Sequence, residues 1–136
     1  MEKTKLYKYK YGFYPFNLYI VFGNDPSFIL KHFKCYYKNE DELNEDFNKS
    51  SALTMNATLK EGLLYGVLIF FNLGCEINNG LFVHESSHAT KRLFKHISAD
   101  INDSETFEYA LEFTFNCCVE SYNKYKKISQ IKKEYE

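Results

Sequence analysis

The stretch GLLYGVLIFFN, residues 62–72, decides the fold predicted for this chain. It is a continuous apolar run of strand length, and such runs are typical of strands buried on both faces. The segment before it, ALTMNATLK (52–60), alternates apolar and polar residues, which predicts a strand with one buried face. Because only Lys60-Glu61-Gly62 separate the two runs, we expect them to form a β-hairpin.

Upstream of this hairpin, FNLYIVFG (16–23) has the composition of another strand, and Gly23-Asn24-Asp25-Pro26 is a turn signal that closes it. Asp25 and Pro26 suit the cap and first turn of a helix, so PSFILKHFKCYY (26–37) is predicted to be helical. The polar stretch NEDELNEDFNKSS (39–51) is typical of a loop or a short exposed helix. Residues 1–13, where lysine alternates with tyrosine, are expected to form a polar lead-in or an edge strand.

Downstream, residues 79–97 have the pattern of a helix, and ISADINDS (97–104) interrupts it. Residues 105–125 form a second predicted helix, and residues 126–136 are expected to be a charged, frayed tail. The inner stripe of the second helix would hold Phe107, Ala110, Leu111, Thr114, Cys118 and Val119. The predicted fold is one α/β (α+β) domain over residues 1–136, with a three- to four-stranded sheet and the order β-α-β-β-α-α.

The bulk composition limits the classes of protein that fit. The chain has 136 residues, of which 45% are hydrophobic and 26% charged, which indicates one soluble globular domain. A net charge of −1 argues against a nucleic-acid partner. No apolar run reaches the roughly 20 residues of a membrane-spanning helix, and no secretory signal opens the chain, so we expect a cytoplasmic protein without a membrane partner. The four cysteines form no CxxC pair and are expected to be reduced and buried.

The segment VHESSH (83–88) carries the candidate chemistry. Residues four apart on a helix share a face, so His84 and His88 can bind one zinc ion (Zn²⁺). Glu85 would flank that ion within reach of a water molecule, which is the place for a general base. The alternative is a surface helix whose histidines are incidental.

A catalytic zinc site needs a third protein ligand. The residues after His88 do not match the HExxHxxGxxH extension, so the ligand would come from elsewhere. The following helix offers Glu105, Glu108 and Glu112, and its first turn would lie beside the end of the motif helix if the two helices are antiparallel. Glu105 also has a structural interpretation, because Asn102 three residues earlier completes a capping-box pattern.

Four segments together resemble a group of small phage- and prophage-encoded proteins named as metallopeptidases by their HExxH motif. These segments are FNLYIVFG, the hairpin ending in GVLIFFN, FVHESSHATKRLF and DSETFEYALEFTFNCCV, and the resemblance covers residues 14 to 122. Two positions depart from the group's pattern: Glu108 replaces a small apolar residue, and Ser86-Ser87 replaces a more apolar pair.

The resemblance implies a minimal gluzincin-like zinc metallopeptidase in the cytoplasm of a host cell. Zinc ligands would be His84, His88 and Glu105, with Glu85 as general base and Tyr109 supporting either the oxyanion or the zinc ligands. The substrate would be a short or exposed peptide or protein segment, paired with ALTMNATLK as an edge strand. The alternative functions are a non-catalytic zinc-binding protein and a metal-free, phage-encoded interaction protein that acts on a host factor.

Overall fold

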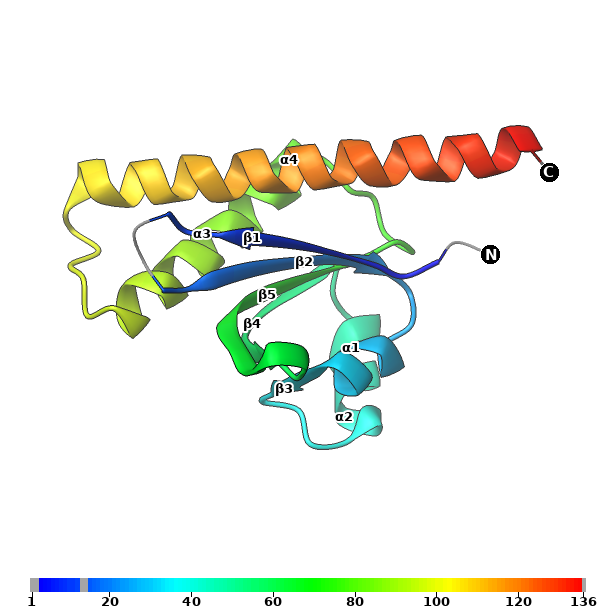
Figure 1. The fold of residues 1–136 in the computed structure, drawn as a ribbon, viewed down its shortest axis with the longest axis horizontal. Helices are drawn as coiled ribbons and strands as arrows, with labels where there is room; N and C mark the ends of the chain where they lie inside the picture. The colour runs from blue at the N-terminus through cyan, green and yellow to red at the C-terminus, as the bar shows by residue number, and fades with distance from the viewer. Residues whose placement is uncertain (1–2, 13–14, 136) are drawn as a thin grey trace.

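A mixed five-stranded sheet forms the centre of the computed structural model, which describes residues 3–12 and 15–135 (Figure 1). The order across the sheet is β1-β2-β5-β4-β3, and only β2 and β5 run parallel. The strands are β1 (Lys5–Lys10), β2 (Asn17–Gly23), β3 (Phe33–Cys35), β4 (Ala52–Leu59) and β5 (Leu64–Asn72). A mixed α+β fold was predicted, but with three to four strands in place of five.

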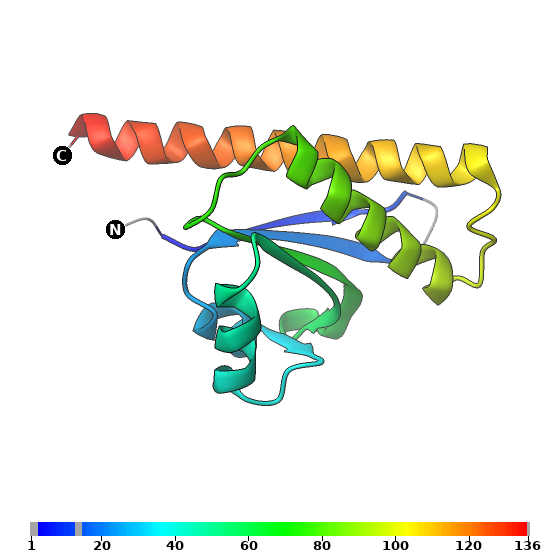
Figure 2. The same ribbon diagram turned by 180° about the vertical axis from the view of Figure 1, so that it is seen from behind.

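Helices cover both faces of this sheet (Figures 1 and 2). One face packs against α3 (Asn79–His96) and α4 (Ser104–Tyr135), and the other against α1 (Ser27–His32) and α2 (Glu40–Asn48). In β5, Val67, Ile69 and Phe71 face the first pair of helices, while Leu68 and Phe70 face the second. The expectation that this strand is buried on both faces is therefore confirmed for residues 66–72.

The predicted hairpin between β4 and β5 is present, with antiparallel pairing from Ala52↔Phe71 to Leu59↔Leu64. A short 3-10 turn (Glu61–Leu63) joins the two strands. Within it Gly62 has a φ of 85°, a left-handed conformation that glycine adopts without steric cost.

The N-terminal half of the sequence differs most from the prediction. The helix predicted over 26–37 ends at His32, because Phe33 turns to an extended conformation and starts β3, which pairs with β4. Residues 40–48 form a true helix, α2, capped by the side chain of Asn39 and anchored by buried Leu43 and Phe47. The lysine–tyrosine segment is an edge strand, β1, paired with β2; residues 1–2 and 13 of that predicted lead-in lie outside the described residues.

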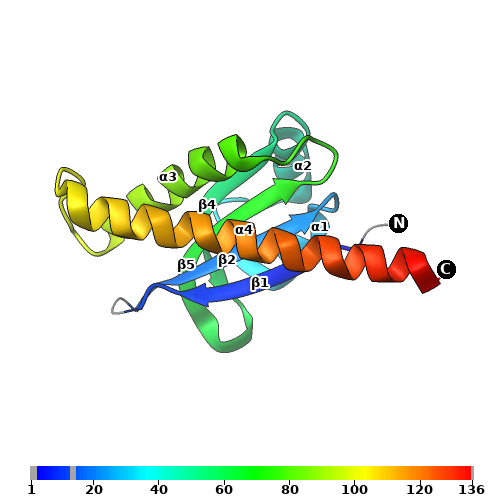
Figure 3. The ribbon, with the colours of Figure 1, turned by 90° about the horizontal axis from the view of Figure 1, so that it is seen from above.

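Helix α4 continues to Tyr135 and does not end near residue 125 as predicted (Figure 3). Tyr122 and Tyr125 pack on the buried ring of Phe22 and hold this part of the helix against the sheet, whereas most of residues 126–131 are exposed. Its first turn is capped by Asp103, which accepts the N–H of Thr106, so the predicted capping box from Asn102 is wrong. Among the described residues, no helix combines the length and hydropathy needed to cross a bilayer.

Candidate metal centre

The two histidines lie on the solvent-facing side of helix α3, because the apolar residues of α3 are buried on its other side. The Asn78 side chain accepts the N–H of Leu81 at 2.9 Å and caps the helix, leaving a well-formed first turn. Phe82, Ala89 and Leu93 then recur at helical spacing and are buried in the core under α3 and α4. His84 and His88 lie on the outer side and are exposed to solvent.

The two imidazole rings converge. The Nε2 atoms of His84 and His88 are 3.1 Å apart. Two nitrogens bound to one tetrahedral zinc ion at about 2.0–2.1 Å would be separated by roughly 3.3–3.4 Å, so the pair is close to the spacing that zinc requires. Together with a carboxylate oxygen of Glu85, ligand atoms of these residues lie within 4.8 Å of one another. His84, Glu85 and His88, hereafter the HExxH group, can thus hold a metal ion.

Glu85 differs from the histidines in being buried. Its side chain is 5% exposed, and Oε2 accepts a hydrogen bond from Thr54 Oγ1 at 3.4 Å. Burial raises the pKa of Glu85, while the neighbouring His84 and the Thr54 hydroxyl partly oppose this rise. A raised pKa makes the Glu85 carboxylate a stronger proton acceptor, which is the property that a general base beside a metal-binding pair needs.

His88 is shifted in the opposite direction. Partial burial lowers the pKa of His88, and the positive charges of His84, Lys91 and Arg92 lower it further. A lower pKa keeps the imidazole neutral over a wider pH range. Since only the neutral ring offers a lone pair to a metal, this shift favours metal binding.

The direction in which the histidines face follows from the partners of their helix neighbours. Towards α4, Ser86 Oγ lies 3.8 Å from Cys118 Sγ. Towards β4, Arg92 donates a hydrogen bond to Asn56 at 3.2 Å. At about 100° per residue, His88 is about 40° from Arg92 around the helix axis but about 160° from Ser86. The HExxH histidines therefore face away from α4 and lean towards β4, which α3 crosses in Figure 3.

The structure does not bring Glu105 to the HExxH group. Within the described residues, that group is the only set of His, Cys, Asp and Glu side chains whose ligand atoms cluster in this way. The Glu105 carboxylate accepts a hydrogen bond from the Tyr109 hydroxyl at 3.3 Å, and both side chains are exposed on α4. Glu108 and Glu112 are also exposed on α4 and outside the cluster. The predicted ligand role of Glu105 and the catalytic role of Tyr109 thus have no supporting contact.

Two residues beside the site were missed from the sequence. Thr54, the partner of Glu85, and Asn56, the partner of Arg92, both come from β4. The alternation in ALTMNATLK contained the signal, because burying Met55 on one face turns Thr54 and Asn56 to the other. The alternation could not show which helix packs on that face.

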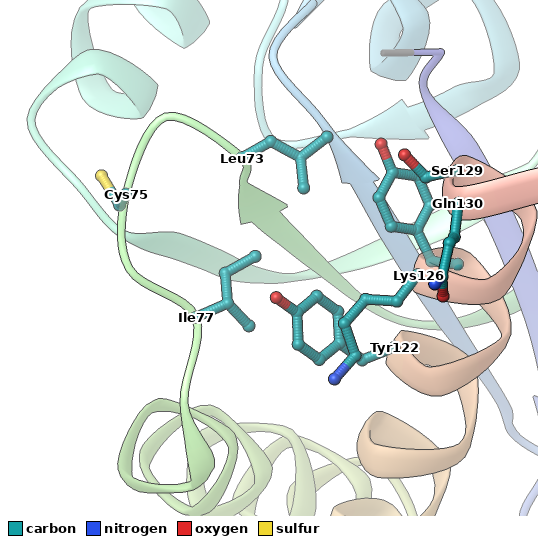
Figure 4. Close-up of a pocket in the computed structure, with 8 residues that line it drawn as sticks. Leu73, Cys75, Ile77, Tyr122, Lys126, Ser129 and Gln130 are labelled. Carbon is teal, nitrogen blue, oxygen red and sulfur yellow. The ribbon is translucent and has the colours of Figure 1, made fainter. Parts of the chain in front are cut away.

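The four cysteines are all free thiols, and two of them are buried in the core. Cys117 and Cys118 are buried, and burial raises the pKa of each thiol to about 12, so neither is a thiolate at neutral pH. Cys75 is exposed, contrary to the expectation of buried thiols, and it borders a cavity of about 330 Å³ between the β5–α3 loop and α4 (Figure 4). In Figure 4 its sulfur points away from Tyr122 and Lys126.

A groove of about 430 Å³ lies on the β4 side of α3. It is lined by Tyr36, Tyr37, Leu53, Thr54, Met55, Asn56 and Arg92.

Comparison with protein-family models, with curated protein sequences and with solved structures finds no match to this chain. Of the residues that carry the resemblance described above, the structure brings together those of the HExxH group.

Proposed function

We propose that this chain is a zinc-dependent hydrolase that cleaves a peptide or other amide bond. The observation that carries the proposal is the convergence of the His84 and His88 Nε2 atoms, 3.1 Å apart, beside the buried carboxylate of Glu85. Two imidazoles at this spacing are two of the three protein ligands of an HExxH hydrolase, and the adjacent buried carboxylate is placed as its base.

The roles follow from the chemistry of the side chains. His84 and His88 would hold zinc, which when bound supplies Lewis-acid activation of a water molecule and of the carbonyl it attacks. Glu85 accepts the proton of the attacking water and then passes it to the leaving amine. Burial of Glu85 and its hydrogen bond to Thr54 hold the carboxylate in position for both transfers.

Strand β4 supports a peptide as the substrate. Strand β3 pairs only with residues 57–59 of β4, so residues 52–56 have no neighbouring strand on the side away from β5 among the described residues. A peptide in extended conformation can add to such an edge through main-chain hydrogen bonds. Thr54 lies in this unpaired half and contacts Glu85, so a peptide held there would pass the base.

A second candidate function is favoured by the composition of the cluster. Because the described part of the chain adds no other side chain to the HExxH group, a Glu85 oxygen can itself serve as the third ligand. The protein would then be a non-catalytic zinc-binding protein. Substitution of Glu85 by glutamine separates the two functions: a hydrolase keeps its zinc and loses activity, whereas a three-ligand binding site loses zinc affinity.

The test is digestion of a mixed peptide library by the zinc-loaded protein, read by mass spectrometry. We expect new termini with wild type, none with Glu85→Gln, and the wild-type pattern with Glu105→Gln, a matched substitution outside the HExxH group. Cleavage by Glu85→Gln at the wild-type rate, or no cleavage by zinc-loaded wild type, would overturn the proposal. If wild type incubated with zinc cleaves nothing, its zinc content after removal of excess metal separates the alternatives. Bound zinc would indicate the zinc-binding protein, and absence of bound zinc would indicate a metal-free interaction protein.

A further inference from the structure

The groove beside the unpaired half of β4 is lined by one cation, Arg92, which is exposed and has no carboxylate partner among the described residues. We propose that this groove selects extended peptides that carry a carboxylate, and that Arg92 receives it. The inference rests on the proposed function, since it names the class of peptide that the same site would take.

The groove exists because β3 is short. Its last residue, Cys35, pairs with Ala57 of β4. After Cys35 the chain leaves the sheet through Tyr36 and Tyr37 towards α2, and both tyrosines line the groove. The half of β4 that β3 leaves uncovered therefore borders a concave surface with α3 on its other side.

Arg92 is held in this groove by a neutral partner. One guanidinium nitrogen donates to Asn56 Oδ1 at 3.2 Å, and Asn56 Nδ2 donates to the Tyr65 hydroxyl at 2.6 Å, which orients the amide. In the part of the chain that the structure describes, the ion pairs are Lys49–Glu45 and Lys124–Glu120, so no carboxylate neutralises Arg92. Most of its five N–H donors thus remain for a ligand, and a guanidinium is suited to bind a carboxylate through two hydrogen bonds.

The register along β4 sets where the carboxylate would lie. Thr54 contacts Glu85, and Asn56, two residues further on, contacts Arg92. Two strand residues span about 6.8 Å, so a peptide parallel or antiparallel to β4 would place its carboxylate about two residues from the bond that faces Glu85. Either an acidic side chain or the terminal carboxylate of the peptide satisfies this spacing.

The observations favour a peptide over a single-stranded nucleic acid. An unpaired strand edge offers main-chain donors and acceptors that match a peptide backbone. Tyr36 and Tyr37, although exposed and partly exposed, meet edge to face at 83° between their planes, so they form no continuous stacking platform for bases. With a net charge of −1 the chain also lacks the electrostatic character of a nucleic-acid binder.

The test is a binding measurement on the full chain in the presence of a chelator, so that no turnover occurs. The probes are fluorescent hexapeptides of alternating valine and threonine, blocked at both ends, with one central glutamate or one central glutamine. A third probe is the glutamine peptide with a free terminal carboxylate, a fourth is the glutamate peptide with alternate backbone amides N-methylated, and a fifth is an oligouridylate. Binding is followed by fluorescence anisotropy.

We expect at least one carboxylate probe to bind roughly tenfold or more tightly than the blocked glutamine probe, the size of a charge-assisted hydrogen bond. Tight binding of the blocked glutamate probe would identify an acidic side chain as the ligand, and tight binding of the probe with a free terminus would identify the terminal carboxylate. Arg92→Gln should abolish this difference, Arg92→Lys should retain part of it, and Lys91→Gln, an exposed cation one residue away that does not line the groove, should retain it. N-methylation should weaken binding of the glutamate probe.

Equal binding of the three unmethylated peptides, or a difference that survives in Arg92→Gln, would overturn the inference. Tighter binding of oligouridylate than of any peptide would also overturn it. Failure of the proposed function is separate. A chain that binds carboxylates through Arg92 but cleaves nothing when zinc is restored refutes the hydrolase alone, whereas a hydrolase without carboxylate preference refutes this inference alone.

Discussion

Thr54 of β4 donates a hydrogen bond to Glu85 of α3 at 3.4 Å, and this contact joins the unpaired half of a strand to the buried carboxylate of the HExxH group. The strand edge and the HExxH group come from different parts of the fold, and Thr54 links them because it belongs to the edge and contacts Glu85. The arrangement makes Glu85 the residue on which the proposed chemistry depends.

Substituting Glu85 should change stability in a pH-dependent way. Burial raises the pKa of Glu85 in the folded chain above its value in the unfolded chain. At pH values between these two pKa values, the folded chain therefore binds more protons than the unfolded chain. The free energy of unfolding therefore falls as the pH rises through that window, and above it the ionised carboxylate carries a desolvation cost. We expect Glu85→Gln to melt a few degrees higher than wild type at pH 8 in chelator, and close to wild type at about pH 4.

Thermal melts of both proteins across this pH range, with Glu105→Gln as the exposed control, measure the effect. Because the Glu105 side chain is exposed, Glu105→Gln should show no such gain in melting temperature at pH 8. A Glu85→Gln protein that is less stable than wild type at pH 8 would mean that the ionised carboxylate is stabilised in the fold, contrary to its burial.

Removing the Glu105 carboxylate should leave metal binding unchanged. The resemblance assigns this residue as the third ligand, but it lies on α4, bonded to Tyr109, while the histidines face away from that helix. We expect Glu105→Ala to bind zinc with the dissociation constant of wild type, measured by competition with a chromophoric chelator. A large loss of affinity would restore Glu105 as a ligand and require α4 to move relative to α3.

The central sheet should depend strongly on Phe22. Its ring is fully buried, stacks on Phe71 at 5.1 Å and contacts Tyr122 and Tyr125 of α4. Phe22→Ala should lower the free energy of unfolding by about 3–5 kcal/mol, because it removes a large apolar contact and leaves a cavity. Val83→Ala, at a half-exposed position on α3, should stay within about 0.5 kcal/mol of wild type. Urea denaturation measures both, and a loss below about 1 kcal/mol at Phe22 would contradict this packing.

The parts of the fold that could be predicted are those with an uninterrupted local pattern. The alternation in β4, the apolar run of β5 and the periodicity of α3 each identify one kind of element over most of its length. Strand β3 could not be found in this way, because Phe33 continues the helical spacing of α1 and becomes extended only through its pairing with Leu59. Such pairing is a tertiary gain that outweighs local preference.

The candidate site could likewise be predicted only in the part that depends on local helical geometry. Both histidines and Glu85 lie within five residues of one helix, so helical geometry alone predicts that they converge. The third ligand could not be predicted, because it depends on which flank of α3 the next helix covers. That flank is selected by Ser86 and Phe94, which pack on α4 and turn the histidines away from it.

The most direct test of the proposed metal centre is the zinc content of the purified protein, measured by elemental analysis after dialysis against zinc and then buffer. We expect about one zinc ion per chain for wild type and for His96→Ala, a matched histidine at the end of α3 that stacks on Phe16 and lies outside the HExxH group. His84→Ala/His88→Ala should bind none while keeping the wild-type melting temperature in chelator, since both rings are exposed. Zinc retained by the double variant, or no zinc on wild type, would contradict the metal centre.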